Sequence, residues 1–253
     1  MGVAGVGAMV LPGCAAFKDP AAPTNSGTLL NDPVIVARVT APKGTAALKG
    51  TTVVYSSPDQ TEEAFLYVPA NYSPATPAPL LLMLHDENST SFSTLQLYLP
   101  HADAAGLVLL AVDSVAQSWD IVTTGFYGPD VGFINAALAA TFNVVNVDPA
   151  RVAVEGFSNG AAYALAIGLT NGDLFSRVIA FAPAAIEPYT PEGKPSFFLA
   201  QGLNDQVYDI TQTGRVLNQN LTTKGYSVDY VEFNGGHEMP DAIVQQSIAW
   251  LAS

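Results

Sequence analysis

The segment from Gly156 to Gly160 has the sequence Gly-Phe-Ser-Asn-Gly, which fits the pattern Gly-x-Ser-x-Gly. The residues before it, 151–154, have the composition of a short buried strand, and residues 161–169 after it are small and apolar, as in a buried helix. A serine at a tight turn from strand to helix holds its hydroxyl clear of the sheet, beside the free N–H groups of the helix N-terminus. This setting predicts that Ser158 is a nucleophile.

A serine hydroxyl needs a base to take its proton, and histidine is the usual base near neutral pH. The chain has three histidines. His85 ends a predicted buried strand, and His101 lies in a predicted helix. His237 ends the glycine-rich stretch Asn-Gly-Gly-His between the last predicted strand and the last predicted helix, where a loop can carry an imidazole to the sheet edge. We therefore expect His237 to be the base, rather than a structural histidine.

The base in turn needs a carboxylate to hold its tautomer. Asp205 directly follows a predicted buried strand, where a loop would present it at the same sheet edge. Asp209 is the rival, but its position suits the beginning of the next helix. The chain order Ser158, Asp205, His237 is that of α/β-hydrolases. Negative charge that develops on a tetrahedral intermediate needs N–H donors, and the backbone N–H of Asn159 is the first candidate.

The elements that must position these groups alternate along the chain. Apolar runs with the character of strands buried on both faces alternate with amphipathic stretches, which predicts an α/β fold with a mostly parallel sheet of about eight strands and helices on both faces. The expected strands are 51–56, 63–68, 80–84, 107–112, 152–154, 177–181, 196–200 and 227–233, of which the first two are expected to be antiparallel. The expected helices are 91–105, 130–142, 159–170, 211–224 and 240–252, with Asp130 as a cap and Gly225 as a stop.

We expect residues 46–253 to form one domain after a signal-like segment and linker, residues 1–45. Only residues 183–195 separate two of the predicted strands, which is too short for a helical lid domain. The site is therefore expected to be open, or covered by loops, and to accept extended or bulky substrates.

From about Glu63 to Leu251 the chain resembles the phospholipase/carboxylesterase branch of the α/β-hydrolase superfamily, near the feruloyl-esterase-like and polyhydroxybutyrate-depolymerase-like serine esterases. The motifs that carry the resemblance are Leu-Tyr-Val-Pro at 66–69, Ala-Asp-Ala-Ala-Gly at 102–106, Trp-Asp at 119–120, Tyr-Gly-Pro-Asp-Val at 127–131, Val-Glu-Gly-Phe-Ser at 154–158 and Gly-Gly-His-Glu-Met-Pro at 235–240. The resemblance implies a serine esterase that needs no metal or cofactor, with Ser158, Asp205 and His237 as its catalytic triad. It also places the second oxyanion donor at the backbone N–H of Glu87.

The sequence departs from the family pattern at three places. The oxyanion loop has His-Asp-Glu-Asn-Ser at 85–89 where the family has a glycine-rich motif, which suggests a positive φ at Asp86 and places two carboxylates near a developing oxyanion. Gln201 stands where the family often has histidine, a change expected to affect only packing. Glu155 puts a carboxylate beside the serine turn.

Two aromatic residues, Trp119 and Tyr127, are candidates for a substrate pocket, and aromatic packing beneath a loop is the alternative. Asp120 could touch the site, but satisfying backbone N–H groups of its loop is the more economical interpretation. His85, Asp86 and Glu87 are ligand types without a second cluster to complete a metal site, so no metal is expected.

The net charge of −13 argues against nucleic acid and anionic membrane surfaces as partners. No apolar run is long enough for a transmembrane helix. Cys14 is the only cysteine; it follows a small apolar run, a layout that suggests export or a lipid anchor against a plain unstructured terminus. Acyl specificity and oligomeric state are not encoded in any motif.

These observations favour a serine hydrolase that cleaves small-molecule or polymeric carboxylic esters through an acyl-enzyme. Other functions stay open. A thioesterase or a peptidase uses the same triad, and the acidic loop at Asp86 and Glu87 suits a hydrolase-fold protein that has lost turnover and binds a ligand or partner.

Overall fold

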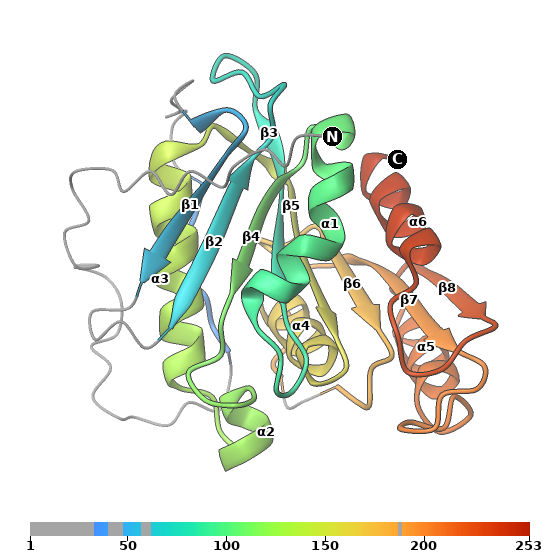
Figure 1. Ribbon diagram of the computed structural model, residues 1–253. Coiled ribbons are helices and arrows are strands. Elements are labelled where there is room, and N and C mark those ends of the chain that lie inside the picture. The colour runs from blue at the N-terminus through green and yellow to red at the C-terminus, as the bar shows by residue number, and fades with distance from the viewer. Residues whose placement is uncertain (1–32, 40–47, 57–61, 187–188) are drawn as a thin grey trace.

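The computed structural model describes residues 33–39, 48–56, 62–186 and 189–253 (Figure 1). Its centre is an eight-stranded sheet in the order β1-β2-β4-β3-β5-β6-β7-β8. The strands are β1 (Thr51–Ser56), β2 (Glu63–Val68), β3 (Ala78–Leu84), β4 (Val108–Val112), β5 (Val147–Phe157), β6 (Arg177–Phe181), β7 (Ser196–Gly202) and β8 (Val228–Phe233). The helices are α1 (Ser91–Ala105), α2 (Asp120–Thr124), α3 (Pro129–Val144), α4 (Asn159–Thr170), α5 (Gly214–Thr223) and α6 (Asp241–Ala252).

Strands β3 to β8 run parallel to one another, and β2 is antiparallel to both β1 and β4. This confirms the predicted mostly parallel sheet with two antiparallel strands at its start. Because the parallel strands point the same way, all of them end at one edge, at the bottom of Figure 1. We call it the carboxyl-terminal edge, and the other one the amino-terminal edge. Loops at the carboxyl-terminal edge can bring residues far apart in sequence to one place.

Helices cover both faces of the sheet, which buries the strands on both sides (Figure 1). Helices α1 and α6 lie on one face, where Met83 and Tyr98 belong to one apolar core. Helices α3, α4 and α5 lie on the other, where Leu82 and Tyr163 belong to a second core. Neighbouring residues of a strand face opposite sides, so two cores require an uninterrupted apolar run such as that of β3.

Most predicted elements are present, and the differences lie in the connections. Strand β5 begins at Val147, and α2 has five residues, too few to give a periodic pattern. Helix α5 begins at Gly214 rather than at 211, because Asp209 accepts hydrogen bonds from the backbone of Thr211 and Gln212 and makes a turn there. Among the described residues between β6 and β7, 182–186 and 189–195, there is no helix.

The prediction that Asp130 caps its helix is wrong. Helix α3 begins at Pro129, so Asp130 lies inside its first turn. The buried Asp130 carboxylate accepts hydrogen bonds from the backbone N–H groups of Val115 and Asp120, both at 2.6 Å. It therefore holds the preceding loop rather than the end of its own helix.

Residues 33–39 lie against the face of the domain that α3 and α4 form. Asn171 accepts a hydrogen bond from Ile35 N at 2.8 Å, and Asn135 accepts one from Ala37 N at 2.7 Å. The Ile35 side chain is completely buried. Cys14 and most of the predicted linker lie outside the described residues. None of the helices that the structure describes is long and apolar enough to span a membrane.

Candidate active site

Ser158 stands at the turn between β5 and α4, at the carboxyl-terminal edge of the sheet. Its φ of 55° and ψ of −117° lie outside the regions that residues with a side chain normally adopt. Its backbone N–H donates to the carbonyl oxygen of Phe181 on the neighbouring strand, at 3.0 Å. A strained backbone that the surrounding structure holds in place is typical of the nucleophile turn that the sequence predicts.

The two glycines of the motif are required by close approach of backbone segments. A Cβ on Gly156 would overlap the carbonyl group of Gly160, and a Cβ on Gly160 would overlap the carbonyl oxygens of Leu84 and His85. Helix α4 thus begins in direct contact with the end of β3. The loop that follows β3 is thereby placed next to Ser158.

His237 and Asp205 come to Ser158 from two other loops of the same edge. His237 Nε2 lies 2.9 Å from Ser158 Oγ, and His237 Nδ1 lies 2.9 Å from Asp205 Oδ2. Because a carboxylate only accepts, Nδ1 carries the ring proton and Nε2 is free to accept the proton of the serine hydroxyl. The structure brings together the three residues of the predicted triad in the order that general-base activation of a serine needs.

The Asp205 side chain is completely buried beneath His237. Its Oδ1 accepts from the backbone N–H groups of Val207 and Tyr208, both at 2.9 Å, and its Oδ2 also accepts from Gln201 Nε2 at 3.3 Å. Burial works to raise the pKa of Asp205, but the hydrogen bonds from His237 and from the two backbone groups outweigh it and lower the pKa. Asp205 is therefore held as the anion that an imidazolium requires.

Two residues at the acid were missed by the sequence analysis. Gln201 does more than pack, because it bonds Asp205 as well as Tyr208 O and, through Oε1, accepts from Gly214 N at 2.9 Å. The Tyr208 ring lies edge-on to the His237 ring, with centroids 5.3 Å apart. Neither residue belongs to a sequence motif. The one indication of their role is that both lie close to Asp205 in the chain. The rival carboxylate, Asp209, makes a turn instead.

The loop after β3 forms a turn in which Asp86 O accepts from Ser89 N at 3.3 Å. The positive φ expected at Asp86 occurs at Asn88, with a φ of 59°, which asparagine tolerates better than most residues. The His85 ring orients this turn. Its Nε2 accepts a hydrogen bond from Ser114 N at 2.9 Å, so its Nδ1 carries the proton and donates to Asp86 O at 2.6 Å. His85 is a buried, structural histidine.

The position of Asp86 O fixes that of the Glu87 N–H. Both belong to one trans peptide, so the N–H points away from the carbonyl oxygen and hence away from the His85 ring. The Asn159 N–H is among the first of α4, where backbone donors have no partner within the helix. These two groups are the candidate oxyanion donors.

The side chain of Asn159 links the loops around the nucleophile. Its Nδ2 lies 3.3 Å from both Glu87 Oε2 and Ser118 Oγ, and its Oδ1 accepts from Tyr208 OH, also at 3.3 Å. Glu87 itself is exposed, so its carboxylate is solvated while it accepts from Asn159. The sequence identified the backbone of Asn159 but gave no indication of this role for its side chain.

Trp119 and Tyr127 lie beneath the site and are completely buried. Trp119 donates from Nε1 to His85 O at 2.9 Å and packs against Tyr163, whose ring also contacts Tyr127. The burial favours the alternative interpretation of these two residues, aromatic packing under the loops. Neither side chain presents a surface to a substrate.

Asp120 lies beside this aromatic group and satisfies its loop. It accepts from the backbone N–H groups of Gly128 at 2.7 Å and Asp130 at 3.1 Å, and from Tyr163 OH at 3.2 Å. Burial raises the pKa of Asp130 to about 7, and repulsion from Asp120 adds to this. The pair holds the segment between β4 and α3 against the start of α4.

Glu155 is completely buried on the face of β5 where Tyr98 of α1 packs. Tyr98 OH donates to its Oε2 at 3.3 Å, while its Oε1 has no hydrogen-bond partner. Burial raises the pKa of Glu155 to about 8, although the hydrogen bond from Tyr98 works to lower it. Glu155 therefore holds its proton at neutral pH and places no charge beneath the serine turn.

The remaining histidine, His101, lies away from the site and bonds Asp241 at 2.7 Å. Within the ranges that the structure describes, no group of three or more histidine, cysteine or acidic side chains is arranged to hold a metal ion.

No family model and no curated protein matches the sequence. The structure, however, is similar to that of an S-formylglutathione hydrolase, FrmB, from Staphylococcus aureus, with a TM-score of 0.65 over 80% of this chain and 98% of that chain. The sequences are 13% identical. The protein has the α/β-hydrolase fold.

Other α/β-hydrolase structures are similar as well. FphF, a fluorophosphonate-binding serine hydrolase of Staphylococcus aureus, has a TM-score of 0.65 at 12% identity, over 80% of this chain and 97% of that chain. The esterase Est2 of the Planctomycetes species Thermogutta terrifontis has a TM-score of 0.61 at 15% identity, over 83% and 92%. At such identities the likeness is one of α/β-hydrolase fold. The phospholipase/carboxylesterase branch stays a prediction from the sequence motifs.

Proposed function

We propose that the protein is a serine hydrolase that cleaves carboxylic esters through an acyl-enzyme. The observation that carries the proposal is the hydrogen-bonded chain from Ser158 Oγ through the His237 ring to Asp205, at the carboxyl-terminal edge of an α/β-hydrolase fold. The esterases and hydrolases with similar structures add support at the level of fold.

In the proposed reaction, Ser158 Oγ attacks the ester carbonyl while His237 Nε2 takes the hydroxyl proton. The Asp205 carboxylate stabilises the imidazolium, and the N–H groups of Asn159 and Glu87 stabilise the negative oxygen of the tetrahedral intermediate. His237 then gives its proton to the leaving alcohol. A water molecule repeats the sequence on the acyl-enzyme and releases the acid.

The kind of ester that the site would accept is inferred from the surface around the loop of Asp205. Leu203 and Val207 flank Asp205 in sequence and are exposed, with 47% and 59% of their surfaces accessible. Exposed apolar side chains next to the triad suit an ester with an apolar portion, whether small or polymeric. The described part of the β6–β7 connection has no helix to cover them.

The test is covalent labelling with a fluorophosphonate together with hydrolysis of a panel of esters and thioesters of varied acyl length. We expect labelling and hydrolysis by the wild type, and neither by Ser158→Ala. Equal labelling of both proteins, or hydrolysis that survives the substitution, would contradict the proposal. A wild type that is labelled but hydrolyses nothing would favour the binding-protein alternative, and Asp86→Gly then asks whether the loop alone blocks turnover.

A further inference from the structure

The lysine and arginine side chains of the described residues gather at one edge of the sheet. Seven described residues are lysine or arginine, and only Arg215 lies toward the carboxyl-terminal edge, where it is paired with Glu232 at 2.7 Å. The other six belong to the amino-terminal edge: Arg38, Lys49, Arg151, Arg177, Lys194 and Lys224.

Their places follow from the directions of the elements. Arg177 is the first residue of β6, and Arg151 pairs with Asp148, next to the first residue of β5. Lys194 and Lys224 precede the first residues of β7 and β8, and Lys194 donates to Lys224 O at 3.0 Å. Arg38 pairs with Asp173, beyond the end of α4, and Lys49 precedes β1, whose first residue is paired with the last one of β2.

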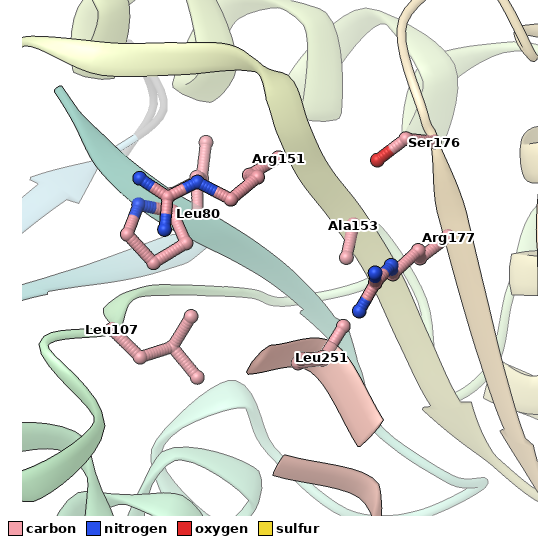
Figure 2. A pocket seen from close by; sticks show the side chains of 8 residues that line it. Leu80, Leu107, Arg151, Ala153, Ser176, Arg177 and Leu251 are labelled. Carbon is pink, nitrogen blue, oxygen red and sulfur yellow. The ribbon is translucent and has the colours of Figure 1, made fainter. Parts of the chain in front are cut away.

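Figure 2 shows two of these cations beside one pocket. The side chains of Arg151 and Arg177 border a pocket whose apolar lining includes Leu80, Leu107 and Leu251. This pocket lies at the edge of the sheet opposite Ser158, and its lining includes none of the candidate catalytic residues. Six of the seven described lysine and arginine side chains therefore lie where the proposed chemistry does not take place.

The edge that carries Ser158 presents carboxylates instead. Asp86 and Glu87 follow β3, Asp113 follows β4, and Glu238 follows His237. Glu87 is the one bonded to the residue after the nucleophile, since Asn159 Nδ2 donates to its Oε2 at 3.3 Å. It is also exposed, so a bound substrate can meet its charge directly.

We propose that Glu87 makes this site selective by charge, favouring esters that carry a cationic group and disfavouring those that carry a carboxylate or a phosphate. The inference rests on the proposed ester hydrolysis. A carboxylate beside the reacting centre attracts a cationic portion of the substrate, and the surrounding edge offers no unpaired cation among the described residues to bind an anionic one. Such selectivity is electrostatic, so salt weakens it.

The test uses three 4-nitrophenyl esters that differ in charge at similar size. They are the esters of 4-(trimethylammonio)butyric acid, of its neutral isostere 5,5-dimethylhexanoic acid, and the monoester of glutaric acid, which is an anion. For the wild type at low ionic strength we expect kcat/KM to fall in the order cationic, neutral, anionic, with a span of about tenfold or more. Sodium chloride at about 0.5 M should compress that span.

Glu87→Gln keeps the backbone N–H and the shape of the side chain but removes its charge. We expect it to reduce the ratio of cationic to anionic kcat/KM by about threefold or more. Ratios within one enzyme cancel any general effect of the substitution on rate. Glu192→Gln is the matched control, because Glu192 is exposed at the amino-terminal edge, before β7, and should leave the ratio unchanged.

The outcomes separate the two proposals. Hydrolysis of all three esters with equal kcat/KM, or a ratio that Glu87→Gln does not change, would overturn the charge selectivity and leave ester hydrolysis standing. Hydrolysis of none would count against ester hydrolysis, and the rates of Ser158 labelling by a cationic and a neutral phosphonate of equal size then decide selectivity without turnover. Equal labelling rates in the wild type would overturn it.

Discussion

His85 donates a hydrogen bond from Nδ1 to the carbonyl oxygen of Asp86, at 2.6 Å, and so fixes the peptide whose N–H is the candidate second oxyanion donor. The tautomer is set on the other side of the ring, where Ser114 N donates to Nε2. A buried histidine directly after β3 thus orients a loop that holds no glycine. Charged residues at 86 and 87 are compatible with a formed turn because the positive φ lies at Asn88.

This relationship predicts the effect of removing the ring. His85→Ala should lower kcat by about tenfold to a hundredfold, with a smaller change in KM, because a displaced donor acts mainly in the transition state. His85→Asn places an amide near the position of Nδ1 and should recover part of the loss. Steady-state kinetics of the two variants measures this, with thermal unfolding as a check on folding.

A control for that prediction is His101→Ala, since His101 bonds the exposed Asp241 and lies away from the site. Its kcat should stay within about twofold of the wild type. A His85→Ala variant that folds and keeps the wild-type kcat would contradict the positioning role.

The two neighbouring aspartates of the acid loop should differ sharply. Asp205→Asn cannot hold His237 in the tautomer that accepts from Ser158, and kcat should fall by about 10³-fold or more, as in other triad enzymes. Asp209→Asn alters only an exposed turn before α5 and should change kcat by less than about threefold. Equal effects of the two substitutions on ester hydrolysis would contradict the assignment.

Glu155 predicts a pH dependence of stability. Its pKa is about 8 in the folded protein against 4.5 as the ordinary value, so the folded state binds the proton more tightly. The stability that this provides is complete below pH 4.5 and is lost as the pH rises through about 8. Glu155→Gln has no proton to lose, so its stability relative to the wild type should increase by about 1.4 kcal/mol per pH unit across that window.

Urea unfolding of the wild type and of Glu155→Gln at several pH values between 5 and 9 measures the difference. Other titrating groups are common to both proteins and cancel. A difference in the free energy of unfolding that stays flat with pH would show that Glu155 titrates normally in the fold.

The glycine at the start of α4 should be intolerant of any side chain. Gly160→Ala places a methyl group onto the carbonyl oxygens of Leu84 and His85 and should cost about 3 kcal/mol or more of stability, with loss of ester hydrolysis. Gly225→Ala is the control: it meets nothing within 4 Å, and its cost is limited to the positive φ, about 1 kcal/mol. Thermal and urea unfolding would distinguish these two magnitudes.

The sheet could be predicted from the sequence because a strand that is buried on both faces needs an uninterrupted apolar run, such as that from Leu80 to Leu84. It predicted the positions of Ser158 and His237 because a strand–turn–helix and a glycine-rich loop are local patterns. Those patterns require no knowledge of distant neighbours.

The contacts that support the site correspond to no local sequence pattern. Asn159 bonds Tyr208 OH and Glu87 across loops that meet only in the folded chain. Gln201 lies near Asp205 in the chain, but no sequence pattern marks its bond to that carboxylate. An aromatic residue in a loop, such as Trp119, suits a substrate pocket or a core equally well on sequence alone. Its complete burial in the structure favours the core. The residue with positive φ is Asn88 rather than Asp86, because the sequence alone does not say which residue of a turn takes that conformation.

The placement of lysine and arginine away from Ser158 also bears on the end of the proposed reaction. Ester hydrolysis yields a carboxylate, and here that anion would form beside Glu87, at an edge whose single described cation is already paired. Repulsion then favours departure of the acid over its rebinding. We expect weak inhibition by the product, and a rate that holds as the acid accumulates.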